Sequence, residues 1–130
     1  MIETAVIAAG ALMLGAAAGA AAMAGRPAAA TPKAYIVTEV DVTGDAEAFQ
    51  RDYAAHAAAT TAPFGGRYLA RGGRTVSLEG APPKGRIVIC AFDSVEQAQA
   101  WRHSPAYVKI AAVRLREASS RQYIVEGLPE

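Results

Sequence analysis

The stretch from Phe64 to Gly73, FGGRYLARGG, combines two glycine pairs, two arginines and a tyrosine. Arg67 and Arg71 carry planar guanidinium groups whose donors match the geometry of carboxylates and phosphates. Residues four apart on a strand share a face, so the two arginines are expected to point the same way if no bulge intervenes. Glycine permits backbone angles and close approaches that a Cβ atom would prevent. The stretch is therefore the first candidate for an anion-binding site.

His56 is the residue best suited to proton transfer, because imidazole is the side chain that titrates near neutral pH without perturbation. It falls on one stripe of a predicted helix, beside Tyr53, and is expected to face the core. Two interpretations stay open at this point. His56 is either a partly buried histidine with a satisfied hydrogen bond or a general acid or base.

Other kinds of chemistry find little support. Cys90 is the single cysteine, which excludes an intramolecular disulfide and a multi-cysteine metal site. His56 and His103 form no ligand pair at helical spacing, so no metal is expected. The glycine pairs lack the sequence context of a phosphate-binding loop, and no serine lies in a nucleophile elbow. No cofactor is predicted.

Length and charge bound the remaining possibilities. A chain of 130 residues with a net charge of +1 fits one domain and gives no electrostatic reason to expect nucleic acid as a partner. Cys90 sits in the apolar run of residues 87–92, where a small buried hydrophobe is its natural role.

The amino-terminal residues have a composition of their own. Residues 4–25 are apolar and uncharged, and Arg26-Pro27 and three alanines come after them. This pattern predicts a signal peptide or membrane anchor over residues 1–30, although Glu3 replaces the usual positive charge. The domain is expected to be exported to the periplasm or medium, or anchored through residues 4–25. With an uncleaved anchor, the cations after the run would keep the domain cytoplasmic.

The secondary-structure elements that would position the candidate residues begin after residue 33. Residues 34–42 are rich in β-branched and aromatic types and predict a strand. Asp45 to Thr61 predicts an amphipathic helix that Pro63 and Gly65 end. Residues 67–71 predict a second strand, which residues 74–79 continue after a bulge at Gly72-Gly73.

The second half of the domain repeats this order. Residues 86–92 predict a strand so apolar that both of its faces must be covered. A helix from Ser94 to about His103, a new helical start at Ser104-Pro105 and a strand over residues 120–126 complete the domain. This order predicts an α+β, ferredoxin-like βαββαβ fold with an antiparallel sheet and helices on one face. A partner subunit is the simplest cover for the other face.

Six segments together resemble the DUF1330 family: AYIVTEVDVT, FGGRYLARGG, VSLEG, VICAFDSVEQAQAW, SPAY and SRQYIVEG. The resemblance covers residues 33–127, the whole predicted domain. It implies the dimeric α/β-barrel fold, in which two ferredoxin-like sheets pair face to face as a homodimer. The superfamily includes cofactor-independent monooxygenases, isomerases, haem-degrading enzymes and stress-response barrels, so the resemblance implies a fold more than a reaction.

The resemblance also implies a small-molecule pocket between helices and sheet. The side chains expected to reach it are Tyr53, His56, Arg67, Tyr68, Arg71, Trp101 and Tyr107. Such a pocket would suit a small anionic metabolite, with His56 removing a proton and Arg67 holding the oxyanion. The alternative is structural: the arginines pair with Glu79, Asp93 or Glu126, the aromatic residues pack in the core, and the protein is a non-catalytic, envelope-associated ligand-binding or structural dimer.

Overall fold

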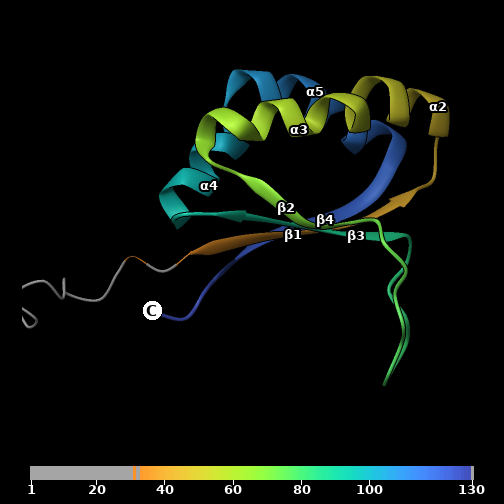
Figure 1. Ribbon diagram of the computed structural model, residues 1–130. Coiled ribbons are helices and arrows are strands. Elements are labelled where there is room, and N and C mark those ends of the chain that lie inside the picture. Colours follow the sequence, from red (N-terminus) through yellow and green to blue (C-terminus); the bar gives the residue numbers. More distant parts are fainter. Residues whose placement is uncertain (1–30, 32, 130) are drawn as a thin grey trace, which may run out of the picture. The chain divides into compact units, whose positions relative to one another are not determined.

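The computed structural model describes residues 31 and 33–129, which form a four-stranded sheet with helices on one face (Figure 1). The elements in chain order are β1 (Ala34–Val42), α2 (Ala46–Phe49), the π-helix η1 (Gln50–Ala54), α3 (Ala55–Thr61), the 3-10 helix η2 (Ala62–Phe64), β2 (Arg67–Arg71), β3 (Arg86–Phe92), α4 (Val95–Arg102), α5 (Pro105–Glu117) and β4 (Ala118–Glu126). The strands lie in the order β2-β3-β1-β4, and each neighbouring pair is antiparallel. The predicted ferredoxin-like α+β fold is confirmed.

The amino-terminal expectations for residues 1–30 lie outside the described residues. Within the described part of the chain, no helix is long and apolar enough to cross a membrane.

Strand β1 lies at the centre of the sheet, and its alternating pattern separates the two faces. Its residues Ala34, Ile36, Thr38 and Val40 are buried under the helices. The antiparallel register places Ile36 opposite Cys90 of β3 and opposite a β4 isoleucine, so those strands turn matching residues to the same face. This helix-facing layer forms the core with α4 and α5.

The opposite face of the sheet is apolar at its centre. Val37 of β1 lies between Ile89 of β3 and Tyr123 of β4. Tyr123 and its β4 neighbour Val125 are 40% and 47% exposed. No helix of residues 33–129 covers this face (Figure 1).

The helix predicted over residues 45–61 is present, with Asp45 as its N-cap, but a π-helical segment interrupts it. A π turn spans one residue more than an α turn, so the core-facing stripe advances beyond it. The buried positions after the interruption are Ala54, Ala57 and Thr61. His56 is exposed. The prediction that His56 faces the core is wrong, because regular helical spacing does not continue through this segment.

The connection to β2 depends on Gly65 and Gly66. Gly65 has a left-handed φ of 72° and ends η2, and a Cβ on Gly66 would lie 2.6 Å from the Phe92 ring. The strand itself contains a bulge: Tyr68 pairs with Cys90, whereas Ala70 pairs with the residue before it in β3, Ile89. The side chains that follow the bulge therefore point to the opposite face from the one that regular alternation would give them.

The helices of the second half begin as predicted. The Ser94 hydroxyl accepts from the Gln97 amide at 3.1 Å and starts α4, and the Ser104 hydroxyl accepts from the Tyr107 amide at 3.4 Å and starts α5. The two N-caps bend the chain between the helices and bring Trp101 and Tyr107 together, with ring centroids 4.0 Å apart.

The predicted strand continuation over residues 74–79 is wrong. After Gly72, which has a φ of 72°, residues 72–85 leave the sheet as an exposed arm that projects on the side away from the helices (Figure 1). Residue types that favour strands still need a neighbouring strand to pair with. Because β3 begins at Arg86, it offers residues 74–79 no backbone with which to pair.

Candidate functional site

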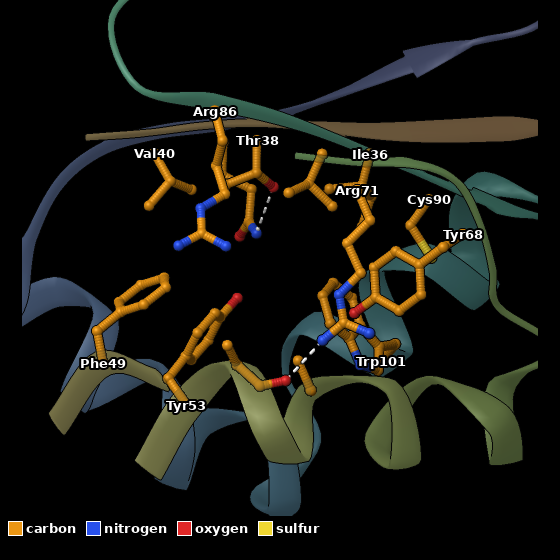
Figure 2. A pocket seen from close by; sticks show the side chains of 14 residues that line it. Ile36, Thr38, Val40, Phe49, Tyr53, Tyr68, Arg71, Arg86, Cys90 and Trp101 are labelled. Atoms are coloured by element: carbon orange, nitrogen blue, oxygen red, sulfur yellow. Dashed lines mark hydrogen bonds between the residues drawn. The ribbon is translucent and has the colours of Figure 1, made fainter. Parts of the chain in front are cut away.

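A small cavity lies between the helix-facing side of the sheet and the helices that come after β1 (Figure 2). The volume open to the centre of a water molecule is about 40 Å³. Fourteen residues line this central cavity: Ile36, Thr38, Val40, Phe49, Tyr53, Ala54, Ala57, Tyr68, Arg71, Arg86, Val88, Cys90, Trp101 and Gln122. The lining is mainly apolar, with a few converging polar groups, which is the usual composition of a small-molecule site.

Arg71 reaches the cavity from the edge strand β2. The bulge in β2 turns its side chain toward the helices, and Nη2 donates to the Ala54 carbonyl at 2.6 Å. The guanidinium also stacks on Tyr68, with Cζ 4.7 Å from the ring centroid. Arg71 thus connects the sheet to the π-helical segment and leaves further donors available to a ligand.

Arg86 is the second cation of the cavity and was not among the predicted site residues. It stands at the start of β3 and shares the helix-facing side with Val88 and Cys90. Its Cζ lies 5.1 Å from the centroid of the Phe49 ring. Alternation along the strand was the available signal, because Arg86 lies an even number of residues before the buried Cys90.

The cavity carries positive charge without compensation from its own walls. None of the lining residues is acidic, and no acidic side chain within residues 33–129 forms an ion pair with Arg71 or Arg86. Figure 2 shows both guanidinium groups projecting from the sheet toward the helices, that of Arg86 above Phe49 and Tyr53 and that of Arg71 beside Tyr68 and Trp101. Because an arginine stays protonated, this space attracts an anion.

A pair of tyrosines forms the polar floor of the site. The hydroxyls of Tyr53 and Tyr107 lie 2.7 Å apart, and Gln122 Nε2 donates to the hydroxyl of Tyr107 at 3.4 Å and to Thr38 Oγ1 at 3.1 Å. Burial raises the pKa of Tyr53 far above its ordinary value, and the neighbouring Tyr107 raises it further. The Tyr53 hydroxyl is therefore protonated at neutral pH.

The other tyrosine and the cysteine of the wall are also neutral at neutral pH. Burial raises the pKa of Tyr68 to about 12 and that of Cys90 to about 11. The predicted burial of Cys90 is confirmed, since its exposed fraction is 3%. Trp101 closes the cavity from α4, and its Nε1 donates to Thr60 Oγ1 at 3.0 Å.

The structure brings together four of the seven residues predicted to share a pocket: Tyr53, Tyr68, Arg71 and Trp101. Tyr107 does not line the cavity: it is fully buried, and its hydroxyl contacts that of Tyr53, which does line it.

Arg67 and His56 lie elsewhere. Arg67 precedes the bulge, points to the other side of the sheet and forms an exposed ion pair with Asp93 at 3.9 Å. His56 lies on the outer surface of α3, in a shallow depression beside Asp52 and Lys109. Arg86 and Gln122 were not among the predicted site residues, although alternation along their strands places both on the helix-facing side. Within residues 33–129, no three His, Cys, Asp or Glu side chains gather as a metal site would require.

Comparison with solved structures identifies the fold. The RPA0582 protein of Rhodopseudomonas palustris, described as a protein of unknown function, superposes with a TM-score of 0.61 at 18% identity, covering 75% of this chain and 83% of that one. SnoaB of Streptomyces nogalater, a cofactor-independent oxygenase, superposes with a TM-score of 0.52 at 16% identity, covering 73% and 92%. No curated protein sequence matches the chain.

The family assignment rests on the sequence of the domain itself. Residues 33–128 match the family described as "Domain of unknown function (DUF1330)", which agrees with the resemblance seen in the six sequence segments. The match spans β1 to β4 and includes every residue of the central cavity. The chain belongs to the DUF1330 family.

Proposed function

We propose that the central cavity binds a small organic anion, with Arg71 and Arg86 as the groups that hold its charge. The observation that carries this proposal is the pair of guanidinium groups facing a cavity that no acidic residue lines. The rings of Phe49, Tyr53 and Trp101 provide apolar contact for the body of the ligand.

The size of the cavity limits the ligand. Its volume of about 40 Å³ is a few times the roughly 10–15 Å³ that one water molecule needs on this measure. A ligand of only a few non-hydrogen atoms fits without rearrangement. A larger one must displace a side chain of the cavity wall.

The chemistry of the walls favours electrostatic stabilisation over proton transfer. The lining groups other than arginine that can ionise are Tyr53, Tyr68 and Cys90, and burial raises the pKa of all three. A general base at His56 is not part of this proposal, because His56 lies on the outer surface. The two arginines would stabilise an anionic substrate or intermediate. The similarity in fold to SnoaB, a cofactor-independent oxygenase, supports an enzyme of this kind.

A non-catalytic binding protein is the second candidate. It is favoured by the same observation, namely that no wall residue ionises near neutral pH. The two candidates share the ligand class and differ in whether the bound anion reacts.

Fluorescence of Trp101, the single tryptophan of the chain, provides the binding assay. The protein is titrated with formate, acetate, pyruvate and benzoate. Arg71→Met and Arg86→Met are each expected to weaken binding about tenfold or more, the effect of losing a charged hydrogen bond. Arg67→Met removes the same charge from the same strand on the opposite face and is expected to leave the affinity unchanged. Equal losses in Arg67→Met and Arg71→Met would refute the cavity as the site.

NMR spectra of the bound anions, recorded over hours in aerated buffer, separate the two candidates. New signals that depend on Arg71 identify an enzyme. An unchanged ligand identifies a binding protein.

We further propose that two copies pair through the exposed sheet face around Val37, Ile89 and Tyr123. The apolar centre of this face and its lack of a covering helix within residues 33–129 support a homodimer. The arm of residues 72–85 projects on the same side and carries Val76 and Leu78, which are 64% and 94% exposed. Contact with the second copy would bury both side chains.

A further inference from the structure

Arg114 of α5 is a buried cation that does not line the central cavity. Its exposed fraction is 2%, the lowest of any arginine in the described chain. Nη1 donates to Ser120 Oγ at 2.5 Å, and Cζ lies 5.7 Å from the centroid of the Tyr53 ring. Its Nε is buried and has no hydrogen-bond partner among the described residues.

Such an arrangement is costly unless something compensates the charge. A buried polar group without a partner is unfavourable, and a buried charge more so. A buried lysine could lose its proton, but a guanidinium keeps its charge in a protein. Within residues 33–129, no acidic side chain forms an ion pair with Arg114. An anion that compensates this charge would therefore have to come from outside this part of the chain.

A groove beside β4 gives such an anion access. Arg114 lines it together with Arg102, His103, Ser120, Gln122 and Tyr123, and its volume is about 420 Å³. No lining residue is acidic. The groove runs along β4, an edge strand of the sheet, whose free edge presents backbone groups without a strand partner in the described chain.

A second arginine faces the same groove. Arg102 Nε donates to Gln122 Oε1 at 2.7 Å, and its Cζ lies 5.3 Å from the centroid of the Tyr107 ring. These contacts fix the side chain and leave its terminal nitrogens without a hydrogen-bond partner among the described residues. Two positioned guanidinium groups with one hydroxyl, that of Ser120, match the oxygens of a small oxyanion.

We propose that the β4 groove, defined by Arg102, Arg114, Ser120 and Gln122, is a second anion site that binds the carboxylate or phosphate group of a small molecule. It adjoins the central cavity at Ile36 and Gln122, which line both, but uses its own pair of arginines. The proposal stands independently of the function assigned to the central cavity.

The test is a titration of the full chain with inorganic phosphate and, separately, with acetate, monitored by amide NMR shifts of residues 102, 103 and 120. Saturable shifts at these residues are expected with at least one probe, and the responding probe identifies phosphate or carboxylate as the ligand group. Arg114→Met is expected to weaken this binding at least tenfold. Arg116→Met, the same change on the exposed side of the same helix, is expected to have no effect.

Two further variants test the groove if Arg114→Met does not fold and show whether the groove acts independently of the central cavity. If Arg114→Met does not fold, Arg102→Met tests the same site from its half-buried rim, with the same tenfold loss expected. Arg71→Met leaves the shifts at the groove intact if the two sites are independent.

Two results would overturn the proposal. One is the absence of saturable shifts at the groove with both probes in the wild-type chain. The other is a set of shifts that depends on protein concentration alone, which would assign the compensating charge to a carboxylate of a second copy.

Discussion

Arg67 and Arg71 lie on opposite faces of β2 although they are four positions apart, a spacing that places residues of a regular strand on one face. The bulge between Tyr68 and Ala70 inserts one residue into the ladder, so Arg71 turns toward the helices while Arg67 pairs with Asp93 on the other side. The same strand therefore places one arginine in the cavity and another in a surface ion pair. This relationship makes Arg67 the natural control for any experiment on Arg71.

Gly66 and Gly73, one from each of the glycine pairs that bracket β2, are expected to respond differently to alanine. In Gly66→Ala the new Cβ would lie 2.6 Å from Phe92 Cε2 and 2.9 Å from Thr61 Cβ, and both neighbours are buried. We expect a loss of about 1–3 kcal/mol in the free energy of unfolding, as for other overpacked sites. Gly73→Ala has open space and should change stability by less than about 0.5 kcal/mol. Urea denaturation measures both, and equal midpoints would contradict the packing argument.

Most of the fold could be predicted because each element depends on local chemistry. The serines at 94 and 104 cap helices as expected, and the alternation of β1 separates its two faces correctly. The strand predicted over residues 74–79 failed for lack of a pairing partner, whereas the misplaced side chains share another cause: the insertion of a residue into a periodic element. The π-helical segment before His56 and the bulge before Arg71 each rotate the later residues of their element to a different face, and periodic spacing carries no signal of either.

The candidate site was predicted only in part, because regular spacing describes the positions of some of its residues and not of others. Tyr53, Tyr68 and Trp101 occupy positions that regular spacing describes well, and they line the cavity. Arg86 follows the irregular arm and begins β3, so the direction of its side chain depends on where that strand begins. Alternation places Arg86 on the same side of the strand as Cys90, but the strand is apolar on both faces, so only its pairing with β1 shows that this side lies under the helices.

The hydroxyl pair of Tyr53 and Tyr107 is expected to be energetically coupled. Tyr107→Phe leaves the Tyr53 hydroxyl and the Gln122 amide without this partner in a buried setting. We expect each single Tyr→Phe variant to lose about 1–3 kcal/mol of stability. The double variant should lose less than the sum, by a coupling energy of about 0.5–3 kcal/mol. Thermal and urea denaturation of the four proteins complete the cycle, and strictly additive losses would show that the hydroxyls do not interact.

The proposed homodimer can be tested at the centre of the exposed sheet face. Val37→Glu places a charge between Ile89 and Tyr123 and should convert the protein to monomers, because an unpaired charge would be buried against the second copy. Val108→Glu introduces the same charge on α5, where the side chain is 48% exposed, and should leave the oligomeric state unchanged. Light scattering after size-exclusion chromatography measures both masses. A monomeric wild-type chain at micromolar concentration would end the proposal.

Cys90 is expected to make the protein less stable as the pH rises through the alkaline range. Burial raises the pKa of its thiol from about 9 in the unfolded chain to about 11 in the folded one. A group with a raised pKa contributes stability that is fully present below the unfolded value and is lost as the pH rises through the folded value. The free energy of unfolding of the wild-type chain should therefore fall between about pH 9 and pH 11. In Cys90→Ala this fall should be shallower, because the buried thiol no longer contributes to it. Urea denaturation at pH 8, 9, 10 and 11 gives the two slopes. Parallel slopes would show that the thiol ionises as easily in the folded chain as in the unfolded one.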